Sequence, residues 1–269
     1  MSGQMIEENI LEIRGLTKSF GGLTAVDHVD IVVKKGTVHS LVGPNGAGKT
    51  TTLSMINGIL PATSGQVFFD GKEITQEKAD KIARMGIGRT FQNIKLFPTL
   101  TVLENIMVGG HAKHTKGGLV RFLIGFRESN HFEDALRAEA EKVARFAGVY
   151  DLKDQLVGNL PYGRQKMTEL ARSLMLQPKL ILLDEPAAGL NPTERSEFVD
   201  MLNEIHQKGT DLFLIEHNMD VVMNVSDSIT VLNFGKKIAE GTPAEIQNNP
   251  DVIKAYLGDG YQAIEKESK

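Results

Sequence analysis

The chain has 269 residues, of which 41% are hydrophobic and 24% charged, a composition that excludes a wholly disordered protein and suffices for one sizeable core. Its formal net charge of -4 provides no overall basic field, so nucleic acid is not among the expected partners. The absence of cysteine excludes disulfides, thiolate metal ligands and cysteine nucleophiles.

The chain opens with short β-type segments. Glu7 and Glu8 stand where a signal peptide would carry basic residues, so we expect no export. Strands are predicted at 11–13, 29–33, 37–42 and 66–69, the last followed by an Asp70-Gly71 hairpin turn, and a helix is predicted over 48–57. We interpret these strands as an antiparallel, β-rich opening.

The middle of the chain changes character. Residues 102–108 and 133–146 show helical periodicity on either side of a stretch from 111 to 131, which indicates a helical insertion. That stretch carries Lys113, Lys116, Arg121 and Arg127 among apolar residues, and is typical either of a docking surface for a membrane subunit or anionic headgroups, or of a basic surface loop.

Strands and helices alternate after the insertion, which predicts a parallel sheet flanked by helices. The predicted strands are 180–183, 212–215 and 229–232, and the predicted helices are 164–176, 193–207 and one from about 219. Residues 265–269 are typical of a solvated tail. No stretch approaches the roughly 18 apolar residues of a membrane span, so any membrane role is expected to be peripheral.

One glycine-rich segment follows a predicted strand and opens a predicted helix. It fits the pattern of a phosphate-binding P-loop, in which backbone amides and a helix N-terminus hold phosphates, the lysine reaches the β- and γ-phosphates, and the following threonine binds Mg2+. We therefore predict ATP and Mg2+ as ligands. The residues are Gly43, Pro44, Asn45, Gly46, Ala47, Gly48, Lys49 and Thr50, with Thr51 next.

A second motif decides among the classes that share such a loop. The apolar run 180–183 ends in Asp184 and Glu185, as expected of a buried parallel strand that carries carboxylates to the ligand edge of the sheet. Asp184 is predicted to hold Mg2+, and Glu185 to act as general base toward the attacking water.

With these two motifs the chain resembles the ATPases of ABC transporters over nearly its whole length. The resemblance implies that Phe20 stacks on adenine with Val26 nearby. It implies that Gln92, in Arg-Thr-Phe-Gln-Asn, touches Mg2+ and water while its loop meets a membrane subunit. It also implies that His217, after the strand 212–215, contacts the γ-phosphate.

The resemblance identifies two further segments. The signature that completes the partner subunit's nucleotide site departs from Leu-Ser-Gly-Gly-Gln and comprises Leu160, Pro161, Tyr162, Gly163 and Arg164. Because Pro161 replaces the serine, Gly163, the amides after it and the helix N-terminus are left for an anion. The dimer-contact loop is Gly189, Leu190 and Asn191, with asparagine where aspartate is more common.

Several segments, including Asp-Glu-Pro-Ala-Ala-Gly-Leu-Asn-Pro and the run from Gly241 to Gly258, look like the ATPases of branched-chain amino acid importers with a longer helical insertion. This implies an α/β fold: a RecA-like P-loop NTPase core with an antiparallel β subdomain and a helical insertion that carries the signature. The implied division of the single domain 1–269 is a core with β subdomain, 10–92 plus 164–260, and a helical subdomain, 93–163.

The implied function is an ATP-hydrolysing, energy-coupling importer subunit for branched-chain or related amino acids. Its implied partners are a second copy or a paralogue, integral permease subunits and, indirectly, an extracytoplasmic solute-binding protein. It would lie peripherally on the cytoplasmic face of the inner membrane and be soluble when isolated.

Other functions are less consistent with the sequence. An ABC ATPase for another cargo remains an alternative. A soluble ABC-type ATPase acting on nucleic acid or the ribosome usually has two ATPase units, coiled coils or metal modules, whereas this chain has one phosphate loop, no heptad run and no cysteine. A GTPase should carry an Asn-Lys-x-Asp sequence, which is absent.

Overall fold

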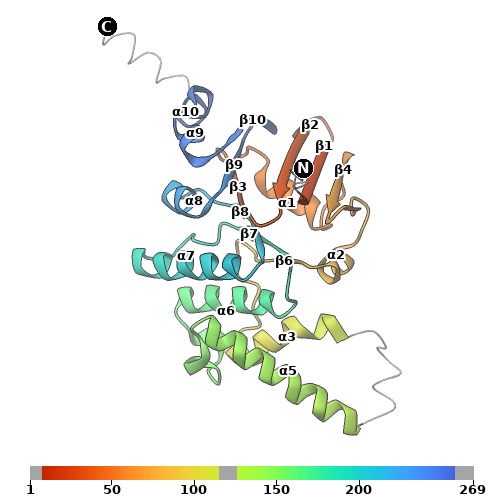
Figure 1. Ribbon diagram of the computed structural model, residues 1–269, viewed down its shortest axis with the longest axis vertical. Coiled ribbons are helices and arrows are strands. Elements are labelled where there is room, and N and C mark those ends of the chain that lie inside the picture. The colour runs from red at the N-terminus through yellow and green to blue at the C-terminus, as the bar shows by residue number, and fades with distance from the viewer. Residues whose placement is uncertain (1–7, 115–125, 258–269) are drawn as a thin grey trace, which may run out of the picture.

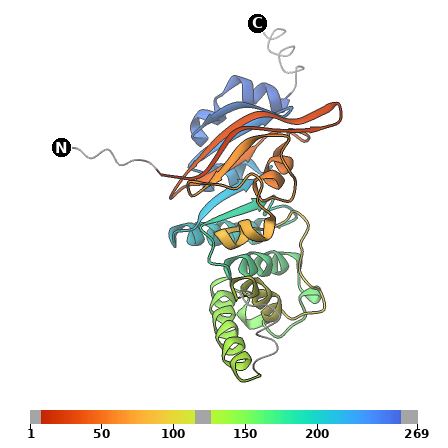
Figure 2. The same cartoon turned by 90° about the vertical axis from the view of Figure 1, so that its right-hand side faces the viewer.

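The computed structural model describes residues 8–114 and 126–257. Two sheets and a layer of helices lie along its long axis, with the four-stranded sheet toward one end and helices α3 and α5 at the other (Figure 1, Figure 2). The α/β class expected from the sequence is confirmed.

The central sheet has six strands in the order β10-β9-β3-β8-β7-β6. All neighbours are parallel except β9 and β10, which form an antiparallel hairpin. The strands are β3 (Val38–Val42), β6 (Ile87–Arg89), β7 (Leu180–Asp184), β8 (Asp211–Ile215), β9 (Ser228–Asn233) and β10 (Lys236–Gly241).

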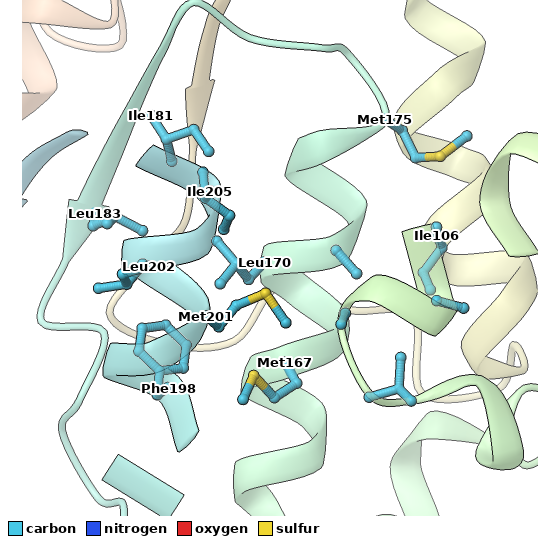
Figure 3. Packing of buried hydrophobic residues seen from close by; sticks show 14 of the residues in the cluster. Ile106, Met167, Leu170, Met175, Ile181, Leu183, Phe198, Met201, Leu202 and Ile205 are labelled. Atoms are coloured by element: carbon cyan, nitrogen blue, oxygen red, sulfur yellow. The ribbon is translucent and has the colours of Figure 1, made fainter. Parts of the chain in front are cut away.

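The position of β7 inside the sheet explains why its sequence is continuously apolar. Ile181 and Leu183 point into a cluster with the helices on one face, whereas Leu180 and Leu182 point into a cluster on the other face. Since successive side chains alternate between faces, a strand covered on both sides must be apolar at every position. Figure 3 shows Leu183 and Ile181 against Leu202 and other residues of the covering helices.

Helices cover both faces of this sheet. On one side α7 (Pro192–Gln207) lies next to the sheet with α8 (Met219–Val225) against it, and beyond α7 lie α6 (Tyr162–Leu174), α3 (Val102–His114) and α5 (Phe126–Phe146). On the other side α1 (Lys49–Ile56) packs its Leu53 and Ile56 against the cluster that contains Leu182. The remaining helices are α2 (Ala79–Met85), α9 (Pro243–Gln247) and α10 (Pro250–Leu257).

The second sheet is antiparallel in the order β2-β1-β4-β5, and consists of β1 (Asn9–Phe20), β2 (Leu23–Lys34), β4 (Ser64–Phe69) and β5 (Lys72–Glu73). The predicted hairpin turn at Asp70-Gly71 is confirmed between β4 and β5. The prediction that 37–42 belongs to this antiparallel group is wrong: β3 pairs in parallel with β8 and β9. All five of its residues are buried, as the middle of a parallel sheet requires.

Three of the predicted helices are present in the structure, whereas parts of the basic stretch and the predicted tail cannot be compared with it. The predicted helices 48–57, 164–176 and 193–207 are confirmed as α1, α6 and α7 with ends shifted by one or two residues. The basic stretch lies partly in the backbone of α3 and α5, but residues 115–125, and the predicted tail 265–269, lie outside the described residues. Among the described residues, the elements that were not predicted include α2, β6, β10, α9 and α10, and the 3-10 helices Tyr150–Leu152 and Val157–Asn159.

Within the described ranges, no helix combines the length and apolar character that a membrane crossing requires.

Candidate functional site

The phosphate loop connects β3 to α1 along a path that only glycine can follow at two points. Gly43 has φ 149°, and a Cβ atom there would lie 2.1 Å from the carbonyl oxygen of Leu232. Gly48, the N-cap of α1, has φ 100°, and its Cβ would lie 2.5 Å from the carbonyl oxygen of Ala25. The loop is therefore seated between β9 and β2, with α1 starting directly behind it.

Lys49 turns back over this loop. Its side chain is buried, and its Nζ donates to the carbonyl oxygens of Gly43 at 2.8 Å and Pro44 at 2.9 Å. Burial lowers the pKa of Lys49, while the carboxylates of Glu185 and Asp184 act in the opposite direction. A buried lysine ammonium beside a loop of this shape is suited to phosphate oxygens. Thr50 is exposed at the start of α1.

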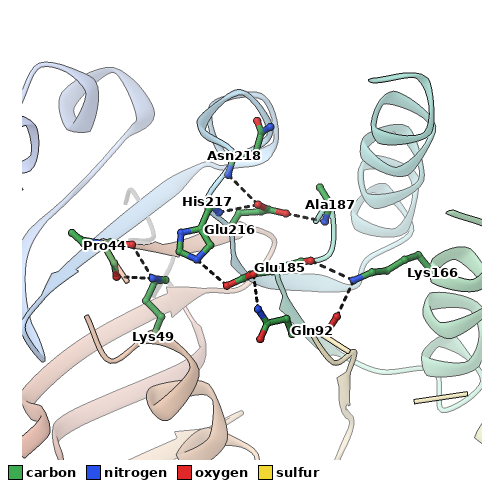
Figure 4. A network of polar contacts seen from close by, with 10 residues as sticks. Pro44, Lys49, Gln92, Lys166, Glu185, Ala187, Glu216, His217 and Asn218 are labelled. Atoms are coloured by element: carbon green, nitrogen blue, oxygen red, sulfur yellow. Dashed lines mark hydrogen bonds and ion pairs between the residues drawn. The ribbon is translucent and has the colours of Figure 1, made fainter. Parts of the chain in front are cut away.

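Three predicted catalytic residues meet at the carboxyl ends of β7 and β8. The two carboxylate oxygens of Glu185 lie 2.8 Å from Gln92 Nε2 and 2.8 Å from His217 Nε2. Figure 4 shows the Gln92 and His217 side chains directed at Glu185, and the Glu185 carboxylate lies near enough to Lys49 to act on its pKa. Glu185 itself has φ +49°, a left-handed conformation that is uncommon for a residue with a side chain and that occurs preferentially at functional sites.

Asp184 lies next to this cluster with one oxygen unpaired. Its Oδ2 is 3.4 Å from Arg89 Nη2, whereas its buried Oδ1 has no hydrogen-bond partner among the described residues. Burial raises the pKa of Asp184, and the Arg89 guanidinium opposes that shift. An unpaired buried carboxylate oxygen is unfavourable on its own, and is the kind of hard oxygen ligand that Mg2+ prefers. The residue therefore fits a magnesium ligand.

The signature segment and the predicted dimer-contact loop pack against each other within one chain. Pro161 is the N-cap of α6, and Tyr162 is exposed. Gly189, with φ +79°, lies under the Tyr162 ring, so that a Cβ there would be 3.0 Å from the ring. A Cβ on Gly163 would be 2.5 Å from Glu194 Oε1. The start of α6 thus rests on the start of α7.

Two details modify the expectations for these segments. The amide of Arg164 donates to the Pro161 carbonyl oxygen at 3.0 Å, and its guanidinium is 3.3 Å from Glu197 on α7. The Arg164 amide therefore already donates within the first turn of α6. This differs from the expectation that the amides after Gly163 face an anion. Asn191 is the N-cap of α7 and forms a capping box with Glu194, a structural role that the sequence analysis did not assign.

The two residues expected near adenine, Val26 and Phe20, differ in their exposure to solvent. Val26 is fully buried, and its Cγ2 would be 3.2 Å from a Cβ on Gly48, so it packs against the phosphate loop. Phe20 is 49% exposed at the end of β1, with Lys18 Nζ 5.1 Å from the ring centroid. The ring is thus accessible for stacking.

Two buried charged residues of this site, Glu216 and Lys166, were not predicted from the sequence. The carboxylate of Glu216 accepts from the amides of Ala187 and His217, both at 2.8 Å, and of Asn218 at 3.1 Å. Lys166 on α6 donates to the carbonyl oxygens of Gln92 and Glu185, each at 3.4 Å. The available signals were an acid at the end of an apolar strand and a lysine three residues after Gly163, on the buried side of a helix.

Comparison with known families agrees with this arrangement. A model described as ABC transporter matches residues 26–188, and a model described as branched-chain amino acid ATP-binding cassette transporter matches residues 236–262. The second match covers β10, α9 and α10, which local patterns did not predict. Of these elements, β10 and α10 line a pocket together with Pro44 and Asn45 of the phosphate loop.

Curated relatives extend over almost the whole chain. BraF of Pseudomonas aeruginosa, a high-affinity branched-chain amino acid transport ATP-binding protein, is 42% identical over 93% of this chain and 98% of its own length. LivG of Escherichia coli, described in the same words, is 40% identical over 94% of this chain and 100% of its own length.

Solved structures show the same fold. A nucleotide-free ATP-binding cassette from an ABC transporter superimposes with a TM-score of 0.82 at 34% identity, covering 93% of this chain and 100% of the other. The ADP conformation of an ATP-binding cassette gives a TM-score of 0.80 at 33% identity, covering 93% and 99%.

Proposed function

Because this chain belongs to the ABC transporter family, in the group of branched-chain amino acid ATP-binding proteins, we propose that it hydrolyses ATP to drive import of branched-chain or related amino acids. The observation that carries the proposal is the Glu185 carboxylate, held by Gln92 and His217 at 2.8 Å each beside the loop of Lys49. A carboxylate oriented in this way is suited to accept a proton from attacking water.

The other residues of the site divide the remaining tasks. Lys49 and the amides of the phosphate loop bind the β- and γ-phosphates, and Phe20 stacks on the base with Val26 behind the loop. Thr50, Gln92 and Asp184 hold Mg2+, which supplies charge neutralisation of the phosphates when bound. His217 keeps Glu185 in place and donates toward the γ-phosphate.

The assembly we propose is a dimer, of two copies or of this chain and a paralogue, in which the start of α6 (160–164) and the loop 189–191 face the partner's nucleotide. The helical subdomain 93–163 and the loop of Gln92 lie toward two integral permease subunits at the cytoplasmic face of the membrane. An extracytoplasmic binding protein delivers the cargo. Residues 10–92 and 164–260 form the core and β subdomain.

Two variants of the purified chain test the ATPase proposal. Lys49→Ala should abolish productive ATP binding with little change in melting temperature, because it removes the ammonium that faces the phosphates. Glu185→Gln should keep ATP binding, lower kcat by about 10²-fold or more, and trap an ATP-bound dimer visible by size-exclusion chromatography. The exposed Lys78→Met is the control. Normal turnover in both site variants would refute the assignment.

The cargo needs a separate measurement. The chain, purified with its native membrane partners and reconstituted in vesicles, should accumulate labelled leucine, isoleucine or valine in an ATP-dependent manner. Native partners that instead accumulate a different cargo would favour an ABC ATPase for another substrate, and would leave the hydrolytic assignment intact.

A further inference from the structure

Helix α6 turns three charged side chains toward the interior of the molecule. Lys166, Glu169 and Arg172 are spaced by three residues and so share one side of the helix. Lys166 and Glu169 are 3% and 2% exposed, and the Arg172 side chain is 15% exposed. Burying charges is costly unless they are paired and hydrogen-bonded, so the groups that these side chains hold are informative.

Glu169 and Arg172 hold the segment that follows Gln92. Glu169 Oε1 accepts from the amide of Lys95 at 3.0 Å, and Arg172 Nη1 donates to the Lys95 carbonyl oxygen at 2.5 Å. The two side chains also approach each other, with Arg172 Nη2 3.7 Å from Glu169 Oε1. Both main-chain polar groups of Lys95 are therefore fixed to α6.

Lys166 holds the catalytic residues themselves. Its Nζ lies 3.4 Å from the carbonyl oxygens of both Gln92 and Glu185, whose side chains meet each other at 2.8 Å (Figure 4). The Lys166 ammonium thus connects the main chain of Gln92 to the main chain of Glu185. Distances of 3.4 Å are at the long end for a hydrogen bond, so a small shift of α6 changes both contacts.

The backbone of Glu185 needs such support. With φ +49° it is in a sparsely populated conformation, which persists only when its surroundings determine it. Its amide donates to the Ile215 carbonyl oxygen at 2.8 Å, which fixes one side, and Lys166 fixes its carbonyl oxygen on the other.

We propose that Lys166 is a positioning residue that connects the signature end of α6 to the Gln92–Glu185 pair of the same chain. The inference rests on the proposed function. Residues 160–164 at the start of α6 face the nucleotide of the partner, whereas Glu185 acts on the nucleotide of its own chain. Engagement of one nucleotide by α6 therefore orients the catalytic pair at the other, and Lys166 transmits this effect without touching ATP.

The first test separates positioning from binding. Lys166→Met keeps a long apolar stem but removes the ammonium; kcat should fall about tenfold or more, since misplacements of about 1 Å have effects of this size or larger. ATP affinity, set by Lys49, should stay within about twofold. Lys166→Arg should restore most of kcat, and Lys78→Met should be neutral. Unchanged kcat in Lys166→Met would overturn the proposal.

The second test asks on which nucleotide Lys166 acts. In a mixed dimer with one Glu185→Gln chain, both chains bind ATP, but only the chain with the intact Glu185 hydrolyses it, in a site completed by the signature of the Glu185→Gln chain. Lys166→Met should lower hydrolysis about tenfold or more when it is on the chain with the intact Glu185, and should be tolerated when it is on the Glu185→Gln chain. The opposite pattern would make Lys166 part of the signature contact and would overturn the proposal.

Two further outcomes are decisive. If Lys166→Met does not fold, Lys166→Gln, which keeps a donor without the charge, takes its place; failure of both to fold would assign Lys166 to stability and overturn the proposal. If Lys49→Ala alone hydrolyses ATP normally, it is the proposed function that fails, which this series distinguishes from a failure confined to Lys166.

Discussion

The carboxylate of Glu216 connects the ends of two neighbouring parallel strands. Glu216 is 2% exposed, and its carboxylate accepts hydrogen bonds from three main-chain amides. One belongs to Ala187 after β7, and the other two belong to His217 and Asn218 after β8. Charge-assisted hydrogen bonds of this kind are stronger than neutral ones. Glu216 therefore sets the distance between the segments that carry Glu185 and His217.

Replacing this acceptor should affect stability and catalysis together. Glu216→Gln keeps the size but turns an amide donor toward groups that are themselves donors, so one or two bonds are lost. We expect a loss of about 2–3 kcal/mol in the free energy of unfolding, measured with urea, and a lower kcat at unchanged ATP affinity. Asp220→Asn, on the exposed side of α8, is the control. A stability equal to that of the native chain would contradict this role.

The residues of the site differ in how far the sequence predicts them. Asp184, Glu185 and His217 follow apolar strands, and the carboxyl ends of parallel strands share one edge of a sheet, so their proximity could be predicted. Lys166 could not be assigned in this way. Its function depends on two carbonyl oxygens, of Gln92 and Glu185, and main-chain acceptors leave no trace in side-chain identity.

At the scale of elements, the N-cap residue of α7 is Asn191, which the sequence analysis placed in the dimer-contact loop. Asn191 caps the helix: its side chain accepts from the Glu194 amide at 3.0 Å, and the Glu194 carboxylate accepts from the Asn191 amide at 3.0 Å. Since the same Glu194 contacts Gly163, the cap also fixes the position of the signature segment.

Substitution of the cap separates these roles. Asn191→Ala should destabilise the chain by about 1 kcal/mol, whereas Asn191→Asp keeps the acceptor, adds a favourable charge at the helix N-terminus and should be at least as stable as the native chain. Thermal and urea unfolding of the two variants provides the measurement. Equal stability of the alanine variant and the native chain would show that the capping box contributes nothing.

The strand β3 contains a titratable group in the core. His39 is 1% exposed, stacks on Phe213 with ring centroids 5.6 Å apart, and has its Nε2 2.9 Å from Thr230 Oγ1. Burial lowers the pKa of His39 to about 4, and Lys237 adds to this shift.

This shift predicts acid destabilisation. The unfolded chain binds a proton at His39 below its ordinary pKa of about 6.5 and the folded chain does not, so stability is full above about 6.5 and is lost as pH falls toward about 4. Between about pH 7 and about pH 5 the native chain should lose about 2 kcal/mol more than His39→Gln, which keeps a polar partner for Thr230 without titrating. Urea unfolding at both values checks this; parallel losses would contradict it.

Elements could be predicted where their pattern is local. The helix 193–207 can be recognised in isolation by its periodicity, and the strand 180–183 by its short, continuous apolar run. The pairing of β3 could not be predicted, since its neighbours β8 and β9 come far later in the chain. Short elements such as β6 and α9 are stabilised by their neighbours more than by their own sequence.

At the scale of the whole molecule, the packing of Gly163 changes how the proposed two-chain site should be tested. A side chain there would collide with Glu194 and disturb the α7 cap, so Gly163→Asp would damage its own chain as well. Arg164 is a better position, because its side chain is partly exposed and its ion pair with Glu197 lies on the surface.

Arg164→Glu should place a negative charge beside the partner's γ-phosphate, and like charges a few Å apart repel by several kcal/mol at an effective dielectric of about 20. The variant should bind ATP at its own Lys49 with normal affinity but neither dimerise on ATP nor hydrolyse it. Mixing it with Lys49→Ala should restore part of the association, because one composite site is intact; light scattering with and without ATP measures this. Normal hydrolysis by Arg164→Glu alone would show that this helix end does not face phosphate.

The position of β3 in the sheet also fixes an order of events during synthesis. Its hydrogen-bonded neighbours are β8 and β9, and the Gly235 amide donates to the Ala47 carbonyl oxygen at 3.1 Å. The nucleotide loop leaves the ribosome long before residues 211–235, so the walls that β8 and β9 supply form only when these later residues emerge. Contacts between such distant segments slow folding and leave an apolar strand exposed for longer. A nascent chain that stops before β9 therefore carries the complete phosphate-binding motif and cannot yet hold it in the shape that binds phosphate.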